Sequence, residues 1–520
     1  LFMSLMIYSD AALSGAIVNP RVAELEGTEM PKLLSASDLR LGGDFAPAAY
    51  VEKQTGVFST TDLVNVFGAP LLSNTATVVS GNVSGNNGGA AQTVQRKAVI
   101  FTRDEKDETT RRLIEWCGYA KYAYRVSTVL PSVSDLSDYS LAFFASYVPA
   151  ASDVATLRTY TESGLTLLFT TLPDFKVLAG STALCDLLGI EDAVRADFEV
   201  NGVHVYKDFF LTDQRIYTHD DIYGELDDMD ITVDYYTLRA GYDVYATAVL
   251  DDQEEQGIVN EKMPPLLWRT ATDDANVYVI NSELFRGKAL LGVVTAFVSH
   301  KDEVNLYPIV NAKTVNVLDF PWMGNENDSE VGSIYGHRLD TLSWDIMWPN
   351  IVQILYNFNH SGNFYVSAQA DYDAPFEASS MNVAQYYYKQ IRKLLSTMSL
   401  SLTQVSAADL ETVLAANEAY FSENLPGYVF TALYAGDFDL DELAAKLRDD
   451  TNTFLQNVSV VLSDWQDGEP VLTSLTDDVL SVKLTTNGWD YEARNDIDMI
   501  SLQTAVGMSN QYVNISEMIY

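Results

Sequence analysis

Residues 97–101 (KAVIF) and the segment at 107–122 (DETTRRLIEWCGYAKY) decide the fold of the region around them. The first stretch is apolar throughout, which is typical of a strand covered on both faces of a sheet. The second has apolar residues at helical spacing behind Thr109 and Thr110, which predicts a helix. The same order recurs in LAFFASY (141–147), SDVATLRTYTESG (152–164) and LTLLFTT (165–171). Repeated strand–helix units predict a doubly wound parallel sheet of the α/β class.

Antiparallel strands are expected to extend this sheet near residues 195–260. Apolar and polar residues alternate there in HVYKDFFL (204–211) and YDVYATAVL (242–250), the pattern of half-exposed strands. A predicted strand, NVYVINSELF (276–285), and a predicted buried helix, GKALLGVVTAFV (287–298), close the region. We therefore expect a first domain at residues 96–300.

The chain before this domain has a different character. Residues 1–72 contain four prolines and no sustained hydrophobic period, so we expect an irregular N-terminal arm. Residues 73–95 begin with a tract of Ser, Gly, Asn, Thr and Ala, which predicts a flexible linker.

A second domain is expected at residues 301–520. It opens with YPIVNAKTVNVLDFPW (307–322), a buried strand that ends in a carboxylate, Asp319, and then Phe320-Pro321. Helical and strand patterns alternate after it, as in WDIMWPNIVQILYNF (344–358) and NFYVSAQ (363–369). This alternation predicts a distorted (β/α) barrel, which we expect to be truncated at its C-terminus.

The charge of the chain limits its partners. With 72 acidic and 32 basic residues, the formal net charge is −40, which repels nucleic acid and anionic lipid. We therefore expect no nucleic-acid partner. A cationic partner, such as a partly deacetylated amino-sugar polymer or calcium, suits this field, and a general adaptation to salt or secretion explains it equally.

The cysteines and the apolar runs of the sequence do not point to a particular function. Cys117 and Cys185 lie in apolar, helix-like stretches, where a buried thiol is the ordinary explanation. The best apolar run, 289–298, has about half of the roughly 20 residues that a spanning helix needs. We expect any signal or anchor segment to lie outside the chain.

The first domain resembles class I glutamine amidotransferase-like proteins, whose nucleophile lies on the turn directly after such a strand. Here that turn is Thr170-Thr171-Leu172-Pro173-Asp174. It has no cysteine, and no His-x-Glu pair follows it, so a Cys-His nucleophile cannot be assembled. Thr170 is interpreted as a strand-end hydroxyl.

The second domain resembles NodB-type polysaccharide deacetylase barrels, whose first strand ends in paired aspartates. The resemblance implies a metal held by one Asp and two His in an HxxxH pair, with a second Asp as base. Here Leu318 stands beside Asp319, and the five histidines form no such pair. Asp319 is interpreted either as a turn-capping residue or as a surviving sugar-binding or acid/base group, the catalytic candidate of this chain. Further carboxylates at predicted loops are Asp340, Asp371, Asp373, Asp464 and Asp490.

A divalent cation is the one cofactor that the sequence leaves open. The densest group of oxygen ligands is THDDIYGELDDMD (218–230), which lacks the spacing of a calcium loop. A solvated acidic loop is one interpretation of this segment, and a cation site is the other. Its weak candidate ligands are His219, Asp220 and Asp221, together with His337.

Aromatic residues supply the candidate sugar-binding surface, because flat rings stack on sugar faces. Core packing is the competing explanation for each. The candidates flank predicted strand ends or loops of the barrel: Trp322, Trp344, Trp348, Trp465, Trp489 and Tyr491.

Over residues 96–520 the chain resembles the DUF2194 family of bacterial extracytoplasmic proteins, in YPIVNAK, LDFPW and the closing NDIDMISLQTAVGMSNQYVNISEMIY. The family's domain order is also similar to that of the modification protein in Pel-type exopolysaccharide systems. The resemblance implies an extracytoplasmic or cell-surface protein that meets polysaccharide and exopolysaccharide-assembly proteins.

Three functions remain open at this point. The first is a catalytically reduced, deacetylase-like binding or scaffold protein of such a system. The second is an active carbohydrate-modifying hydrolase that uses Asp319 and other carboxylates. The third is a structural cell-surface or filament subunit, in which a homo-oligomer exchanges its N-terminal arms.

Overall fold

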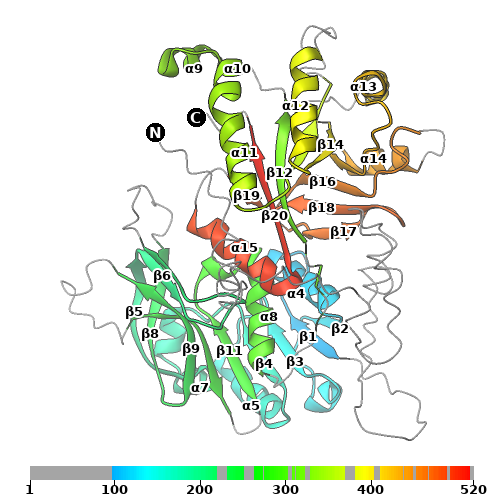
Figure 1. Cartoon of the computed structure of the whole chain (residues 1–520). Helices are drawn as coiled ribbons and strands as arrows, with labels where there is room; N and C mark the ends of the chain where they lie inside the picture. The colour runs from blue at the N-terminus through cyan, green and yellow to red at the C-terminus, as the bar shows by residue number, and fades with distance from the viewer. Residues whose placement is uncertain are drawn as a thin grey trace, which may run out of the picture.

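The computed structural model describes most of the chain after residue 95. The described residues are 96–218, 231–250, 263–272, 275–301, 307, 309–310, 312–321, 328–368, 381–402, 410–436, 438–448, 453–466, 468–488 and 492–515. Within them the strands form two nine-stranded sheets and a two-stranded ribbon (Figure 1). The predicted arm (1–72) and linker (73–95) lie outside the described residues.

The first sheet has a parallel part, as the apolar runs predict. In spatial order its strands are β2 (Ala123–Ser127), β1 (Lys97–Phe101), β3 (Leu141–Phe144), β4 (Thr166–Phe169) and β11 (Asn276–Ile280). Counted along the chain this is the order 2-1-3-4-5, one of the two common orders of doubly wound sheets. The strand order reverses between β1 and β3.

Helices cover both faces of this parallel part. One face packs against α4 (Glu108–Tyr119) and α8 (Ala289–Lys301), and the other packs against α5 (Val154–Glu162) and α7 (Thr182–Leu188). The short α6 (Phe175–Ala179) precedes α7. Burial on both faces explains why β1, β3 and β4 are apolar at nearly every position, whereas β2, at the edge, is half-exposed.

Antiparallel strands extend the first sheet, as expected, but the strand predicted in 204–211 ends at Val205, and one of the added strands lies beyond residue 260. They are β10 (Pro265–Ala271), β9 (Tyr242–Val249), β6 (Gly202–Val205) and β7 (Arg215–Thr218). A separate ribbon pairs β5 (Ile190–Val200) with β8 (Ile231–Leu238).

The second sheet is also mainly parallel. Its order is β17 (Leu472–Ser474), β18 (Leu480–Leu484), β16 (Val460–Asp464), β15 (Ala432–Tyr434), β14 (Thr397–Ser401), β13 (Asn363–Val366), β12 (Ala312–Phe320), β20 (Met508–Asn514) and β19 (Thr486–Asn487). Among these described strands, only β17 runs antiparallel to its neighbour.

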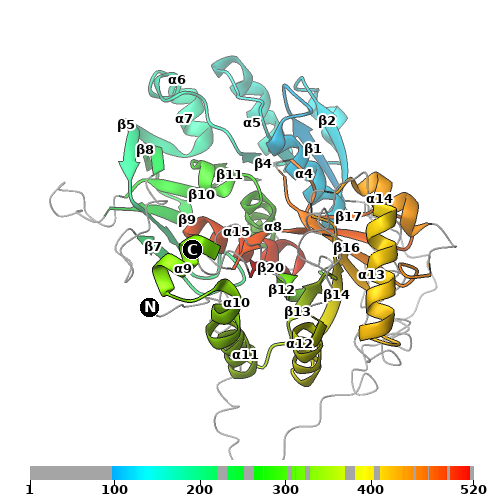
Figure 2. The same ribbon diagram turned by 90° about the horizontal axis from the view of Figure 1, so that it is seen from above.

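Helices line the outer face of the second sheet (Figure 2). They are α9 (Asp328–Tyr335), α10 (Leu339–Leu342), α11 (Trp348–Asn357), α12 (Met381–Lys393), α13 (Leu410–Asn424) and α14 (Leu440–Leu447). A π-helical turn at Ser343–Met347 leads into α11.

A short piece of chain joins the two ends of this sheet. β18 pairs with β16, and β19, which follows it after one residue, pairs with β20. The sheet therefore curls far enough for residues 480–487 to touch both of its ends. The α/β class is confirmed, whereas the amidotransferase-like and deacetylase-like assignments and the division at residue 300 stay predictions.

The two sheets meet through α8 and α15 (Ala493–Val506), which pack side by side (Figure 1). Gly292 on α8 makes the close approach: its backbone N–H donates to Ser501 Oγ over 2.8 Å. A Cβ at Gly292 would lie 2.4 Å from the carbonyl oxygen of Ser501. The apolar core of the first sheet continues into α15, so one core crosses the junction.

Candidate functional site

The inner face of the second sheet carries a small apolar layer. Leu318, Tyr365, Tyr434, Leu462 and Leu484 come from five different strands and form one buried cluster. Inward residues of neighbouring parallel strands lie at one level because the strands are in register. This layer closes the inner face below the ends of the strands.

Polar side chains on the same face are paired with one another. Asn363 donates to the hydroxyl of Tyr365 over 2.9 Å and accepts from Thr397 and Ser399 over 3.0 and 2.8 Å. On β12, Asn316 Nδ2 donates to Asn510 Oδ1 over 2.8 Å. Burial raises the pKa of Tyr365 well above its ordinary value. These groups satisfy each other and stabilise the curled sheet.

A carboxylate is presented where β16 ends. Asp464 is the last residue of that strand and is exposed, and the hydroxyl of Tyr434 on β15 donates to its Oδ1 over 3.0 Å. Tyr434 is buried in the apolar layer, so its hydroxyl is held in place. The pair combines a fixed aromatic ring with an acceptor that can bind hydroxyl, amide or ammonium groups.

Asp319 lies at the same edge of the sheet, one residue before the end of β12. The pairing with β13 shifts there, because Val317 pairs with Phe364 while Phe320 pairs with Val366. Three residues on β12 thus span what two span on β13, which is a bulge, a feature that re-aims side chains beside active sites. We take the carboxyl ends of β12 and β16, with β13, β14 and β15 between them, as the candidate site. The side chain of Asp319 is outside the described part of the structure.

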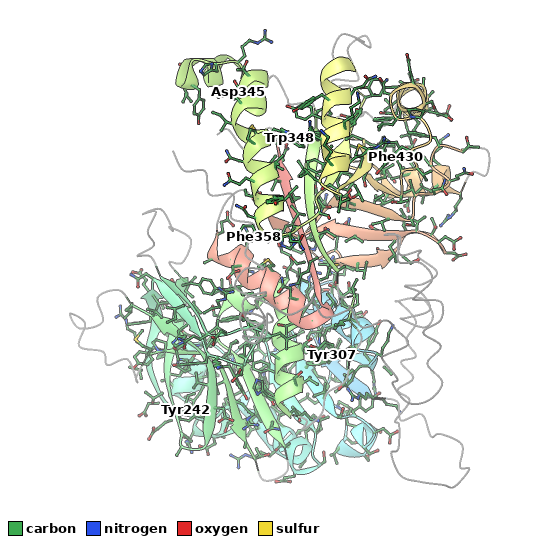
Figure 3. The ribbon with its side chains drawn as sticks, viewed as in Figure 1. Tyr242, Tyr307, Asp345, Trp348, Phe358 and Phe430 are labelled. Carbon is green, nitrogen blue, oxygen red and sulfur yellow. The ribbon has the colours of Figure 1, made fainter. Side chains whose placement is uncertain are left out.

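The structure accounts for two of the six aromatic candidates by packing. Trp348 is buried on α11, with its ring 5.5 Å from Phe320 and 5.1 Å from Tyr387, centroid to centroid (Figure 3). Trp465 lies at the junction between the sheets. The guanidinium of Arg112 lies 4.9 Å from its ring, and the Lys288 ammonium lies 4.6 Å from it.

The structure does not describe the side chains of the other four aromatic candidates. Trp322, Trp489 and Tyr491 lie outside the described residues, and only the backbone of Trp344 is described. The sugar-binding roles of all six stay predictions.

The structure describes only one of the four candidate cation ligands, His337. His219, Asp220 and Asp221 lie outside the described residues, and His337 is exposed beyond α9. Among the residues that the structure describes, no group of three or more His, Cys, Asp or Glu side chains could hold a metal ion. Of the other loop carboxylates, Asp371, Asp373 and Asp490 are outside the described ranges, and only the backbone of Asp340 is described.

Hydrogen-bonded hydroxyls lie at described strand ends of the first sheet. Thr170 is fully buried and donates to the carbonyl of Phe144 over 2.8 Å, the strand-end role expected of it. Where the strand order reverses, Thr102 and Ser146 share a hydrogen bond of 2.8 Å. Cys117 and Cys185 are buried and free, and burial raises the pKa of both thiols.

Tyr434 is the residue of this site that the sequence does not single out. It lies in a predicted strand, GYVFTALYAG (427–436), whose alternation could have placed it on an inner face. Its contact with Asp464 depends on the register between β15 and β16, where Tyr434 pairs with Leu462. Only the fold supplies that register.

The comparisons with known proteins give a family and distant structural likenesses. The family model described as "Uncharacterised protein conserved in bacteria (DUF2194)" matches residues 87–403. No curated protein matches the chain. In the described helices, none is long and apolar enough to cross a membrane.

Among solved structures, an exo-β-1,4-mannosidase from an Opitutaceae bacterium is 15% identical over 36% of this chain and 31% of its own, with a TM-score of 0.25. The chain thus spans about a third of that enzyme. A β-galactosidase from Halorubrum lacusprofundi is 14% identical over 43% of this chain and 32% of its own (TM-score 0.24). A proposed hydrolase from Bacteroides thetaiotaomicron is 10% identical over 82% of this chain and 74% of its own (TM-score 0.24).

Proposed function

The chain is a member of the DUF2194 family, and we propose that it is an extracytoplasmic, polysaccharide-associated protein of an exopolysaccharide (Pel-like) biosynthesis or modification system. In this proposal it binds polymer as a catalytically reduced scaffold, at the carboxyl ends of β12–β16. Assembly proteins of the same system would be its further partners.

The observation that carries the proposal is the Tyr434–Asp464 pair. Asp464 is an exposed acceptor whose orientation is fixed by the hydroxyl of a buried tyrosine. A sugar site needs few polar groups, provided that they are held in place beside an apolar surface. The exposed carboxylate of Asp464 would attract an amino group of a partly deacetylated polymer at short range.

Binding rather than turnover is proposed because the sequence lacks the elements of either expected reaction. The turn after β4 has Thr170 where a cysteine nucleophile would stand. The chain also has no HxxxH pair with which a deacetylase of the usual kind holds its metal.

Isothermal titration with a partly deacetylated N-acetylhexosamine oligosaccharide tests the proposal. We expect the parent chain to bind and Asp464→Asn to bind roughly tenfold more weakly, because a hydrogen bond to a charged acceptor becomes a neutral one. Glu423→Gln is the matched control, since it removes one exposed carboxylate near the opposite ends of the strands. Equal weakening in both variants, or no binding by the parent chain, would contradict the proposal.

An active hydrolase is the second candidate, because Asp319 and Asp464 lie at one edge of the curled sheet, with three strands between them. Two carboxylates in one site can divide the roles of acid and base if their surroundings separate their pKa values. Release of acetate from an acetylated oligosaccharide by the parent chain, and its loss in Asp319→Asn, would establish this function in place of the first.

A further inference from the structure

The amino-terminal ends of β13, β14 and β15 lie at the edge of the second sheet opposite the candidate site. The segments that lead into these strands contain no Asp or Glu: residues 353–363, 389–397 and 424–431. In the whole chain about one residue in seven is acidic, since 72 of 520 are Asp or Glu. We call these three segments the acid-free strip.

Hydrogen bonds hold the strip together as one surface. The N–H of Gly362 donates to Ser396 Oγ over 3.0 Å, which joins the first segment to the second. The N–H of Met398, on β14 directly after the second segment, donates to the hydroxyl of Tyr428 in the third segment over 2.8 Å. The guanidinium of Arg392 lies 5.6 Å from the Tyr428 ring.

Three cations lie along the strip. Lys389, Arg392 and Lys393 are exposed on the last turns of α12. Among the described residues neither lysine has an acidic partner. Glu423, which is exposed, directly precedes the third segment, so three cations stand against one neighbouring carboxylate along these segments. The surface is thus locally positive, and charges farther away than about 8 Å are largely screened at physiological salt.

Large apolar side chains project from each segment. Tyr356 is 81% exposed, Leu395 84% and Val429 52%. Phe358 is 47% exposed at the end of α11 that points toward the first sheet, whereas Asp345 lies at the far end (Figure 3). Leu395 has a positive φ of 55°, a conformation that leucine rarely adopts and that holds its side chain out from the turn.

We infer that the acid-free strip docks on a lipid surface containing anionic headgroups. Exposed lysine and arginine side chains beside separate apolar loop tips match the charge and the apolar boundary of such a surface. Sugar stacking does not explain the strip, because Leu395 and Val429 are aliphatic and stacking needs flat rings. The inference is independent of polymer binding at the opposite edge.

Vesicle flotation with the full chain tests the inference. We expect the chain to float with phosphatidylcholine vesicles containing phosphatidylglycerol, and not with phosphatidylcholine alone. Lys389→Gln combined with Lys393→Gln should weaken flotation roughly tenfold or more, since two basic residues near the surface are lost. The control, Lys176→Gln combined with Lys207→Gln, changes the same charge on exposed residues of the first domain and should float like the parent.

A third variant tests the apolar contribution without endangering the fold. Leu395→Asn removes an exposed tip and suits the left-handed backbone there, so it should fold normally and bind roughly threefold more weakly. Equal flotation of all variants, or flotation that does not depend on the anionic lipid, would overturn the inference. So would a parent chain that stays unbound, or that dimerises in sedimentation through the strip, since the partner would then be a protein surface.

Discussion

The junction between the two sheets and the candidate site differ in how they treat charge. At the junction Arg112 and Glu115 form an ion pair with side chains 1% and 4% exposed, beside Trp465. Glu115 also accepts from the N–H of Val471 over 2.8 Å, which ties α4 to the second sheet. At the candidate site Asp464 is exposed to solvent while it accepts from Tyr434. The junction thus buries its charges in an ion pair, whereas the carboxylate at the strand end keeps its contact with solvent.

Removing Arg112 should have the largest effect on stability. Arg112→Ala leaves Glu115 buried without its counter-ion, which costs about 3–5 kcal/mol. Urea unfolding followed by tryptophan fluorescence measures the loss.

The double variant Arg112→Leu with Glu115→Gln sharpens this test. The amide introduced at position 115 would still offer an oxygen to the Val471 N–H while no charge is buried, so much of the stability should return. If the single and the double variant unfolded at the same urea concentration, the ion pair would not be what matters at the junction.

The second largest loss of stability is expected from crowding where α8 crosses α15. Gly292→Ala places a methyl group 2.4 Å from the backbone oxygen of Ser501, so α8 and α15 must move apart, at about 1–3 kcal/mol. Gly332→Ala is the control, because the nearest atom to its Cβ is 3.9 Å away and alanine favours a helix. Thermal unfolding measures both variants. Equal melting temperatures for Gly292→Ala and Gly332→Ala would argue against a tight crossing of α8 and α15.

A buried carboxyl should make the junction sensitive to pH. Burial raises the pKa of Asp496, although the hydrogen bond from Tyr217 (2.6 Å) and the charge of Arg215 act in the opposite direction. A carboxyl with a higher pKa in the folded state than in the unfolded state loses stability as the pH rises from its unfolded pKa, about 3.9, to its folded pKa.

Asp496→Asn removes this dependence and keeps an oxygen for the Tyr217 hydroxyl. The melting temperature of the variant should therefore gain on the parent as the pH rises above about 4. Asp477→Asn changes an exposed carboxylate of the same domain and serves as the control. A difference from the parent that does not vary with pH would show that Asp496 ionises freely in the folded chain.

The sequence predicts individual helices and strands better than it predicts the contacts between them. The strand at 97–101 and the buried helix around residues 289–298 are confirmed, because unbroken apolar runs leave few alternatives. The strand Thr397–Ser401 is missed, since the serines of TMSLS disguise it, and they face a polar inner surface that only the curled sheet creates. Likewise Asp464 is visible as a carboxylate near a predicted loop, but Tyr434 is not visible as its partner, because register is a property of the folded sheet.

The smallest effect on stability is expected at the candidate site, and it is the outcome that separates the two regions. Asp464→Asn keeps an oxygen that accepts from Tyr434 and changes no buried charge, so the free energy of unfolding should stay within about 0.5 kcal/mol of the parent. Urea unfolding alongside the oligosaccharide titration measures stability and binding on one sample. A variant that keeps its stability and loses binding would place the exposed carboxylate in function. A loss of stability as large as that of Gly292→Ala would show that Asp464 stabilises the fold. The contrast between the junction and the strand ends would then no longer hold.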